Sequence, residues 1–196
     1  MIYAREEIEK WLSKAKIANV IVFDLDGTLV NSDVANFLSY KAAVTCILSE
    51  HIQMNFDPEV RMTREILERI IPYRCRQKIS EIVEQKESIY HHYLSETILN
   101  NNLIEIIDRS KGKEIILATS CRKHRADMLL DYYDLADKFT SKIYGDVNVP
   151  RDKYTKLIPE IMKENKSILI FENDESAIES AISCGISEDC IINVCG

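Results

Sequence analysis

Four short apolar runs recur along the chain, and most of them are separated by stretches with helical spacing. The runs cover residues 20–23, 115–118, 168–171 and 191–194. A continuous apolar run of this length is typical of a strand buried on both faces. Helical patterns follow over 122–133, 153–164 and 175–184, with a weaker strand near 140–144. Strands that alternate with helices predict an α/β fold, a Rossmann-like three-layer core around a parallel sheet.

Residues 31–102 interrupt this alternation. Their apolar residues follow helical spacing without a strand-like run, and Pro58 and Pro72 punctuate the segment. We therefore expect an inserted all-helical cap domain over 31–102. Residues 1–30 and 103–196 should form the α/β core, with a turn through the three asparagines at 100–102 leading back into it.

Composition argues against several classes of protein. The 196 residues carry a net charge of −7, and a non-specific nucleic-acid binder would need a basic face. The sequence has no basic start followed by an apolar leader and no apolar stretch long enough to span a bilayer. The cysteines are scattered without metal-ligand spacing, so reduced thiols and a cytoplasmic location are expected. The oligomeric state is left open.

Two acids follow the first apolar run directly. Asp24 and Asp26 come after residues 20–23, and Gly27 and Thr28 come next. A simple turn explains Asp26 and Gly27, since both residue types are common in turns. It does not explain why two acids should end a fully apolar strand. Ligands of open parallel sheets bind beyond the carboxyl ends of the strands, where these acids are expected.

Other predicted strands end in similar residues. Thr119 and Ser120 follow the second strand, Glu172, Asn173 and Asp174 follow the fourth, and Lys153 begins a predicted helix. So many acids would repel one another without a cation between them, and Mg²⁺ prefers oxygen ligands. Carboxylates, hydroxyls, a lysine and Mg²⁺ together indicate phosphoryl transfer.

These residues bring the chain close to a known family. It resembles the haloacid dehalogenase superfamily, in the branch of phosphatases with a helical cap after the first strand, which includes phosphoglycolate phosphatases and β-phosphoglucomutase-like proteins. "DLDGTL" is similar to the first motif, "IILATS" to the second and "LIFENDESAIESAISCGI" to the fourth. Their order and separations also match, over nearly the whole chain.

The resemblance implies a mechanism. Asp24 would attack phosphorus to form an aspartyl-phosphate, and Asp26 would protonate the leaving oxygen and then activate water. Thr28, Thr119, Ser120 and Lys153 would bind the phosphoryl group. The metal ligands would be Asp24, the Asp26 main-chain carbonyl, Glu172 and either Asn173 or Asp174. An acid at position 26 favours phosphate esters over alkyl halides.

Two positions depart from the family pattern. Asn173 stands where many members have Asp, which predicts weaker metal binding or a shift of the ligand to Asp174. The third motif lacks its common form, and Lys153, Lys156 and Arg151 are its candidate cations, with Lys153 favoured.

The expected function is a Mg²⁺-dependent phosphatase of a small phosphorylated metabolite. Two alternatives stay open: a sugar phosphomutase or phosphotransferase on the same scaffold, and a binding module with weakened catalysis.

Overall fold

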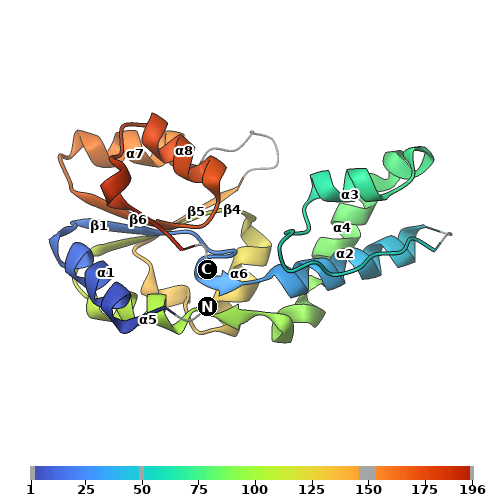
Figure 1. Cartoon of the computed structure of the whole chain (residues 1–196), viewed down its shortest axis with the longest axis horizontal. Helices are drawn as coiled ribbons and strands as arrows, with labels where there is room; N and C mark the ends of the chain where they lie inside the picture. Colours follow the sequence, from blue (N-terminus) through green and yellow to red (C-terminus); the bar gives the residue numbers. More distant parts are fainter. Residues whose placement is uncertain (1–2, 49–50, 146–152, 195–196) are drawn as a thin grey trace. The chain divides into compact units, whose positions relative to one another are not determined.

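The chain forms two compact units in the computed structural model, which describes residues 3–48, 51–145 and 153–194 (Figure 1). One unit comprises Met1–Val30 with Leu99–Gly196, and the other comprises Asn31–Ile98. The return to the first unit therefore falls at residue 99, against the expected 103.

A five-stranded sheet forms the centre of the first unit, in the order β5-β4-β1-β6-β7. Its strands are β1 (Val20–Phe23), β4 (Glu114–Arg122), β5 (Ser141–Gly145), β6 (Ile168–Glu172) and β7 (Ile191–Asn193). Every pairing is parallel, and Val20 lies between Glu114 on one side and Ile168 on the other. The predicted α/β core with a parallel sheet is confirmed.

Helices cover both faces of this sheet (Figure 1). They are α1 (Arg5–Ile17), α5 (Asn101–Arg109), α6 (Lys123–Tyr132), α7 (Lys153–Lys163) and α8 (Glu175–Ser183), with the 3-10 turns η3 (Ala136–Lys138) and η4 (Glu188–Cys190). Tyr154 and Ile158 of α7 are fully buried against the apolar side chains of the central strands. Trp11 of α1 packs edge-on against Phe171 of β6, with ring centroids 5.9 Å apart.

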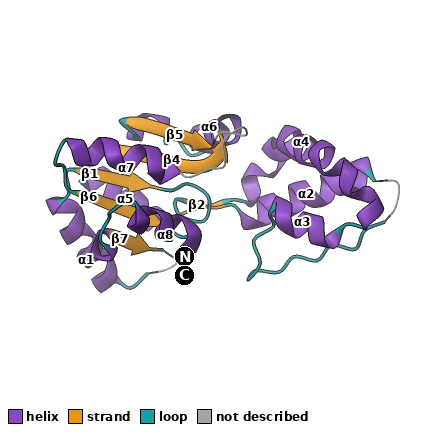
Figure 2. Ribbon diagram, turned by 90° about the horizontal axis from the view of Figure 1, so that it is seen from above, coloured by secondary structure: helices purple, strands orange, loops and turns teal. Residues whose placement is uncertain are grey.

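The second unit is helical (Figure 2). It contains α2 (Asp33–Ile47), α3 (Arg64–Ile70), η1 (Tyr73–Lys78), α4 (Ile79–Ile89) and η2 (Tyr90–Glu96). Its core gathers apolar side chains of α2, α3 and α4, including Phe37, Leu67 and Ile82.

The structure corrects three details of the expected elements. The strands β2 (Val30–Asn31) and β3 (Ile98–Leu99) pair where the chain passes between the units, although no strand was expected near residue 98. The expected turn at 100–102 is wrong, because α5 begins at Asn101. Strand β4 continues to Arg122 instead of ending before Thr119, with a register shift against β5.

Among the described residues, no helix has both the length and the apolar character needed to cross a membrane.

Candidate active site

The two acids of the first motif lie at the carboxyl end of β1. Asp24 and Asp26 are each only 5% exposed. The Asp24 amide donates to the Phe171 carbonyl at 3.0 Å, which extends the β1–β6 ladder up to the acid. Two carboxylates are thus held out of water, where each needs a partner to offset the cost of burying its charge.

Gly27 allows the chain to turn sharply after these acids. Its φ is +91°, and a Cβ built on it would lie 2.3 Å from the Asn173 amide nitrogen. Only glycine fits a left-handed conformation with so little space. The Thr28 hydroxyl donates to Asn173 Oδ1 at 3.0 Å. The loop after β1 and the residue after β6 are therefore fitted to each other.

Lys153 joins two of the predicted acids. It is the first residue of α7, and its side chain is only 6% exposed. Its Nζ lies 2.6 Å from Asp24 Oδ1 and 2.6 Å from Glu172 Oε2. One buried ammonium therefore bridges the carboxyl ends of β1 and β6. This geometry supports Lys153 as the cation of the third motif.

Both carboxylate oxygens of Glu172 are engaged by other groups of the chain. The residue is fully buried, and its Oε2 also accepts the Tyr154 hydroxyl at 2.8 Å. Its Oε1 accepts the backbone amides of Asn173 and Asp174 at 2.9 and 3.0 Å. Both oxygens are engaged by donors of the chain, so Glu172 fixes the ammonium of Lys153 in place.

Burial and the neighbouring charges shift the pKa values of Asp24 and Lys153. Burial, the largest influence, raises the pKa of Asp24 to about 7, and Glu172 adds to the rise while Lys153 opposes it. Burial also works against the charged form of Lys153, but the Asp24 and Glu172 carboxylates outweigh it and raise the pKa of the lysine. Lys153 therefore stays charged, whereas ionisation of Asp24 depends on the cations around it.

Arg125 is the partner of Asp26, and the sequence analysis missed it. Its Nη2 donates to Asp26 Oδ2 at 3.0 Å, with the two side chains 12% and 6% exposed. Its Nε lies 3.0 Å from the sulfur of Cys121. Arg125 lies in the first turn of α6, three residues after β4 ends. That position next to the second motif was the only signal in the sequence.

The remaining candidates differ in their surroundings. Thr119 is buried and its hydroxyl accepts the Cys121 amide at 3.1 Å, whereas Ser120 is exposed. Asp174 caps α8: burial opposes its ionisation, but hydrogen bonds from Ser176 and Ala177 lower its pKa. Arg151 lies outside the described residues, and the side chain of Lys156 is likewise outside the description.

The residues fit Mg²⁺ in chemistry and charge. Asp24, Asn173 and the Asp26 main-chain carbonyl supply oxygen donors, which this ion prefers. In the described cluster, the buried acids Asp24, Asp26 and Glu172 outnumber the paired cations Lys153 and Arg125. In the described part of the chain, no three Asp, Glu, His or Cys side chains are placed so that they could hold a metal ion together, so main-chain and amide oxygens would have to complete the site. Asp174 fits less well, because its carboxylate already caps a helix.

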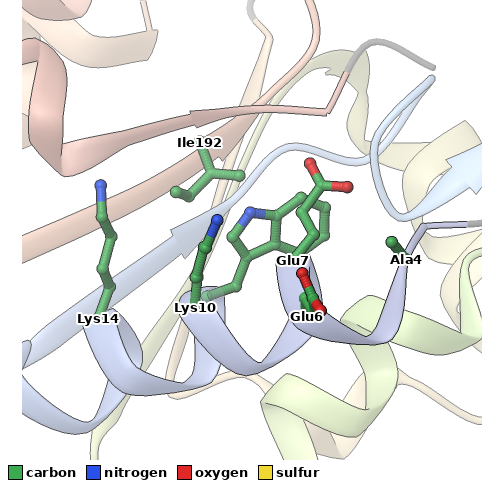
Figure 3. Close-up of a pocket in the computed structure, with 7 residues that line it drawn as sticks. Ala4, Glu6, Glu7, Lys10, Lys14 and Ile192 are labelled. Carbon is green, nitrogen blue, oxygen red and sulfur yellow. The ribbon is translucent and has the colours of Figure 1, made fainter.

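A separate hollow of about 440 Å³ lies beside α1 (Figure 3). Its lining mixes acids and lysines around Trp11 and Ile192: Glu6, Glu7, Lys10 and Lys14, with Ala4 at one end. None of the predicted site residues lines it, and its balanced charges do not favour a phosphate group.

Comparison with known proteins agrees with this geometry. The family model for haloacid dehalogenase-like hydrolases matches residues 21–187. The chain belongs to this family. The match spans the β1 acids, Lys153 and the end of β6, so the buried cluster is part of a haloacid dehalogenase-like hydrolase.

Solved structures of this family share the fold at low sequence identity. A predicted phosphoglycolate phosphatase from Haemophilus somnus 129PT is 18% identical with a TM-score of 0.71, and the match covers 90% of this chain and 84% of the other. CbbY from Rhodobacter sphaeroides, solved with phosphate, is 19% identical with a TM-score of 0.70 and coverages of 91% and 87%. A subfamily IA hydrolase from Geobacter sulfurreducens PCA is 19% identical with a TM-score of 0.65 and coverages of 87% and 85%. At this identity the likeness concerns the fold.

Proposed function

We propose that this hydrolase is a phosphatase that cleaves monoesters of a small phosphorylated metabolite through an aspartyl-phosphate on Asp24. The observation that carries the proposal is the buried Lys153 ammonium, 2.6 Å from both Asp24 and Glu172. A cation fixed beside a carboxylate prepares a place for the negative charge of a phosphoryl group. CbbY, which shares the fold, has been solved with phosphate and with xylulose-(1,5)bisphosphate, in keeping with such a substrate.

In the first proposed step, a carboxylate oxygen of Asp24 attacks phosphorus as the bond from phosphorus to the ester oxygen breaks. Asp26 gives a proton to that oxygen, which leaves as an alcohol. In the second step water attacks phosphorus, Asp26 takes a proton from it, and the Asp24–phosphate bond breaks. Inorganic phosphate and a free Asp24 result.

The surrounding residues hold these groups in place. Lys153 offsets the charge of Asp24 and of the arriving phosphoryl group, and Glu172 keeps Lys153 oriented. Thr119 and Ser120 would bind phosphoryl oxygens. Asp24, the Asp26 main-chain carbonyl and Asn173 would hold Mg²⁺, which would supply further positive charge for the phosphoryl oxygens.

The test is phosphate release from an aryl phosphate with and without Mg²⁺, comparing the wild type with Asp24→Asn. Asp108→Asn is the matched control, because Asp108 is 49% exposed in a pair with Lys138 of the same unit. Metal-dependent turnover that disappears only in Asp24→Asn is expected. Turnover that survives Asp24→Asn would refute the covalent mechanism.

A second experiment distinguishes hydrolysis of the phosphoryl group from its transfer to a sugar. Quenching in acid with a radiolabelled substrate traps label on the protein, and adding a sugar phosphate shows where the label goes. Release as inorganic phosphate supports a phosphatase. Transfer to the sugar would instead favour the phosphomutase alternative.

A further inference from the structure

Arg125 is a largely buried cation with no role in the proposed reaction steps. It contacts Asp26, the residue proposed to move protons, and it does not belong to any of the three motifs. Because β1 and β4 are neighbours in the sheet, the helix after β4 begins beside the loop after β1. The topology thus brings Arg125 to Asp26 across 99 residues of sequence.

The guanidinium is held through two of its nitrogens. Nη2 donates to Asp26 Oδ2, and Nε donates to Cys121 Sγ, both at 3.0 Å. Because the guanidinium is planar, two contacts set the direction of the whole group, which a lysine ammonium would not do. With Arg125 only 12% exposed, water and salt screen the pair with Asp26 weakly.

We propose that Arg125 is a positioning residue for the proposed phosphatase reaction: it sets the direction in which the Asp26 carboxylate points. Asp26 must serve the leaving oxygen first and the attacking water second. Both need the carboxyl group near Asp24, and a displacement of about 1 Å can cost about 100-fold in rate. Cys121 supports this role by accepting the second hydrogen bond of the guanidinium, from Nε. The inference rests on the proposed function.

Two kinds of substrate reveal such a role. An alkyl phosphate has a poor leaving group that needs a proton, whereas an activated aryl phosphate, such as 4-nitrophenyl phosphate, leaves without one. The ratio kcat/KM reports only the steps up to formation of the aspartyl-phosphate, so it isolates the demand for a proton. Asp26→Asn should lose about 10²- to 10⁴-fold on the alkyl ester and little on the aryl ester.

The experiment measures kcat and KM of both esters for the wild type, Arg125→Gln, Asp26→Asn and the double variant. Arg125→Gln should lose about 100-fold on the alkyl ester and less than about tenfold on the aryl ester. The double variant should be no slower than Asp26→Asn, because Arg125 acts through Asp26. Arg109→Gln, at an exposed pair with Glu105, should change neither rate.

Several results would overturn the assignment. An equal loss on both esters, a rise of KM alone, or losses that multiply in the double variant would show that Arg125 serves stability or binds substrate directly. If Arg125→Gln does not fold, Arg125→Lys and Cys121→Ala take its place. Each should show a smaller loss that is still greater on the alkyl ester, and a uniform loss would refute the role.

The failure of this inference and of the proposed function are distinguishable. Wild-type protein without phosphatase activity, or activity that survives Asp24→Asn, refutes the function and this assignment with it. Activity that needs Asp24 but loses no leaving-group preference in Arg125→Gln refutes only the role of Arg125.

Discussion

Replacing Lys153 by methionine would test the charge arrangement of the site by itself, apart from catalysis. The methionine side chain is of similar length but apolar, so Asp24 and Glu172 would lose the ammonium that lies 2.6 Å from each. The pKa of Asp24 is about 7, so its carboxylate is charged only above about that pH; there, removing the partner of a buried charge costs about 3–5 kcal/mol because the charge left behind has no compensation. Glu172 keeps three other donors, so most of the cost should come from Asp24.

The measurement is urea unfolding in metal-free buffer above about pH 7, where Asp24 is ionised, followed by the fluorescence of Trp11. This residue is the single tryptophan of the chain and packs on Phe171, the neighbour of Glu172, so it reports on the α/β unit. With a slope of about 2 kcal/mol per molar urea, the expected loss moves the midpoint down by about 1.5–2.5 M.

The double variant Asp24→Asn with Lys153→Met provides the decisive comparison. Asn removes the carboxylate that Lys153→Met leaves buried without a counter-charge. The double variant should therefore recover at least about 1.5 kcal/mol of unfolding free energy relative to Lys153→Met alone. A midpoint shift below about 0.3 M for Lys153→Met would refute the reasoning. So would losses that simply add in the double variant.

Three further changes test other parts of the site. Asn173→Asp should bind Mg²⁺ several-fold more tightly in calorimetric titration, because it adds a charged ligand, while Asp174→Asn should bind it unchanged; the reverse result would move the ligand to Asp174. Gly27→Ala should lower stability by about 1–3 kcal/mol in thermal unfolding, since φ is +91° and the new Cβ would meet Asn173; unchanged stability would contradict that conformation. Burial opposes ionisation of Asp127, but hydrogen bonds, including one from Tyr144, lower its pKa from 3.8. The ionised carboxylate therefore adds to the stability of the fold above pH 3.8, and this stability is lost as the pH falls through the folded-state pKa. Asp127→Asn should therefore lower the melting temperature at pH 7 and converge with the wild type toward pH 3, and a constant difference would contradict this.

The parallel sheet was predictable because its strands carry their own signal. Each central strand is buried on both faces, so an unbroken apolar run marks it regardless of its neighbours. The polar residues that end those runs mark the candidate site in the same way, because they stand out against an unbroken apolar run. Strands β2 and β3 carry no such signal: each spans two residues, and their pairing depends on the tertiary structure.

The end of β4 shows why boundaries are harder to predict than elements. Thr119 and Ser120 look like the first residues after a strand, because hydroxyl side chains follow an apolar run. In the fold they stay extended to Arg122, and Gly145 of β5 leaves room for the backbone there: a Cβ on Gly145 would lie 2.1 Å from the Ser120 carbonyl oxygen. That fit depends on a residue of another strand, which the local pattern does not contain.

Arg125 escaped the sequence analysis for a related reason. A basic residue in the first turn of a helix is ordinarily exposed to solvent, and nothing in its neighbours distinguishes it. Its burial follows from the order of the strands, which places β4 beside β1, and from Asp26, which needs a counter-charge once it is only 5% exposed. A useful rule is to search for a cation after every strand adjacent to one that ends in two acids.

The balance of buried charges also bears on the amide of Asn173. An aspartate there would place a fourth carboxylate beside Asp24, Asp26 and Glu172, which already outnumber the paired cations. The amide accepts the Thr28 hydroxyl as a carboxylate would, yet adds no repulsion. We therefore expect Asn173 to stabilise the cluster when no metal is bound, at a cost in metal affinity. The gain in Mg²⁺ binding expected for Asn173→Asp should thus come with lower stability in metal-free buffer.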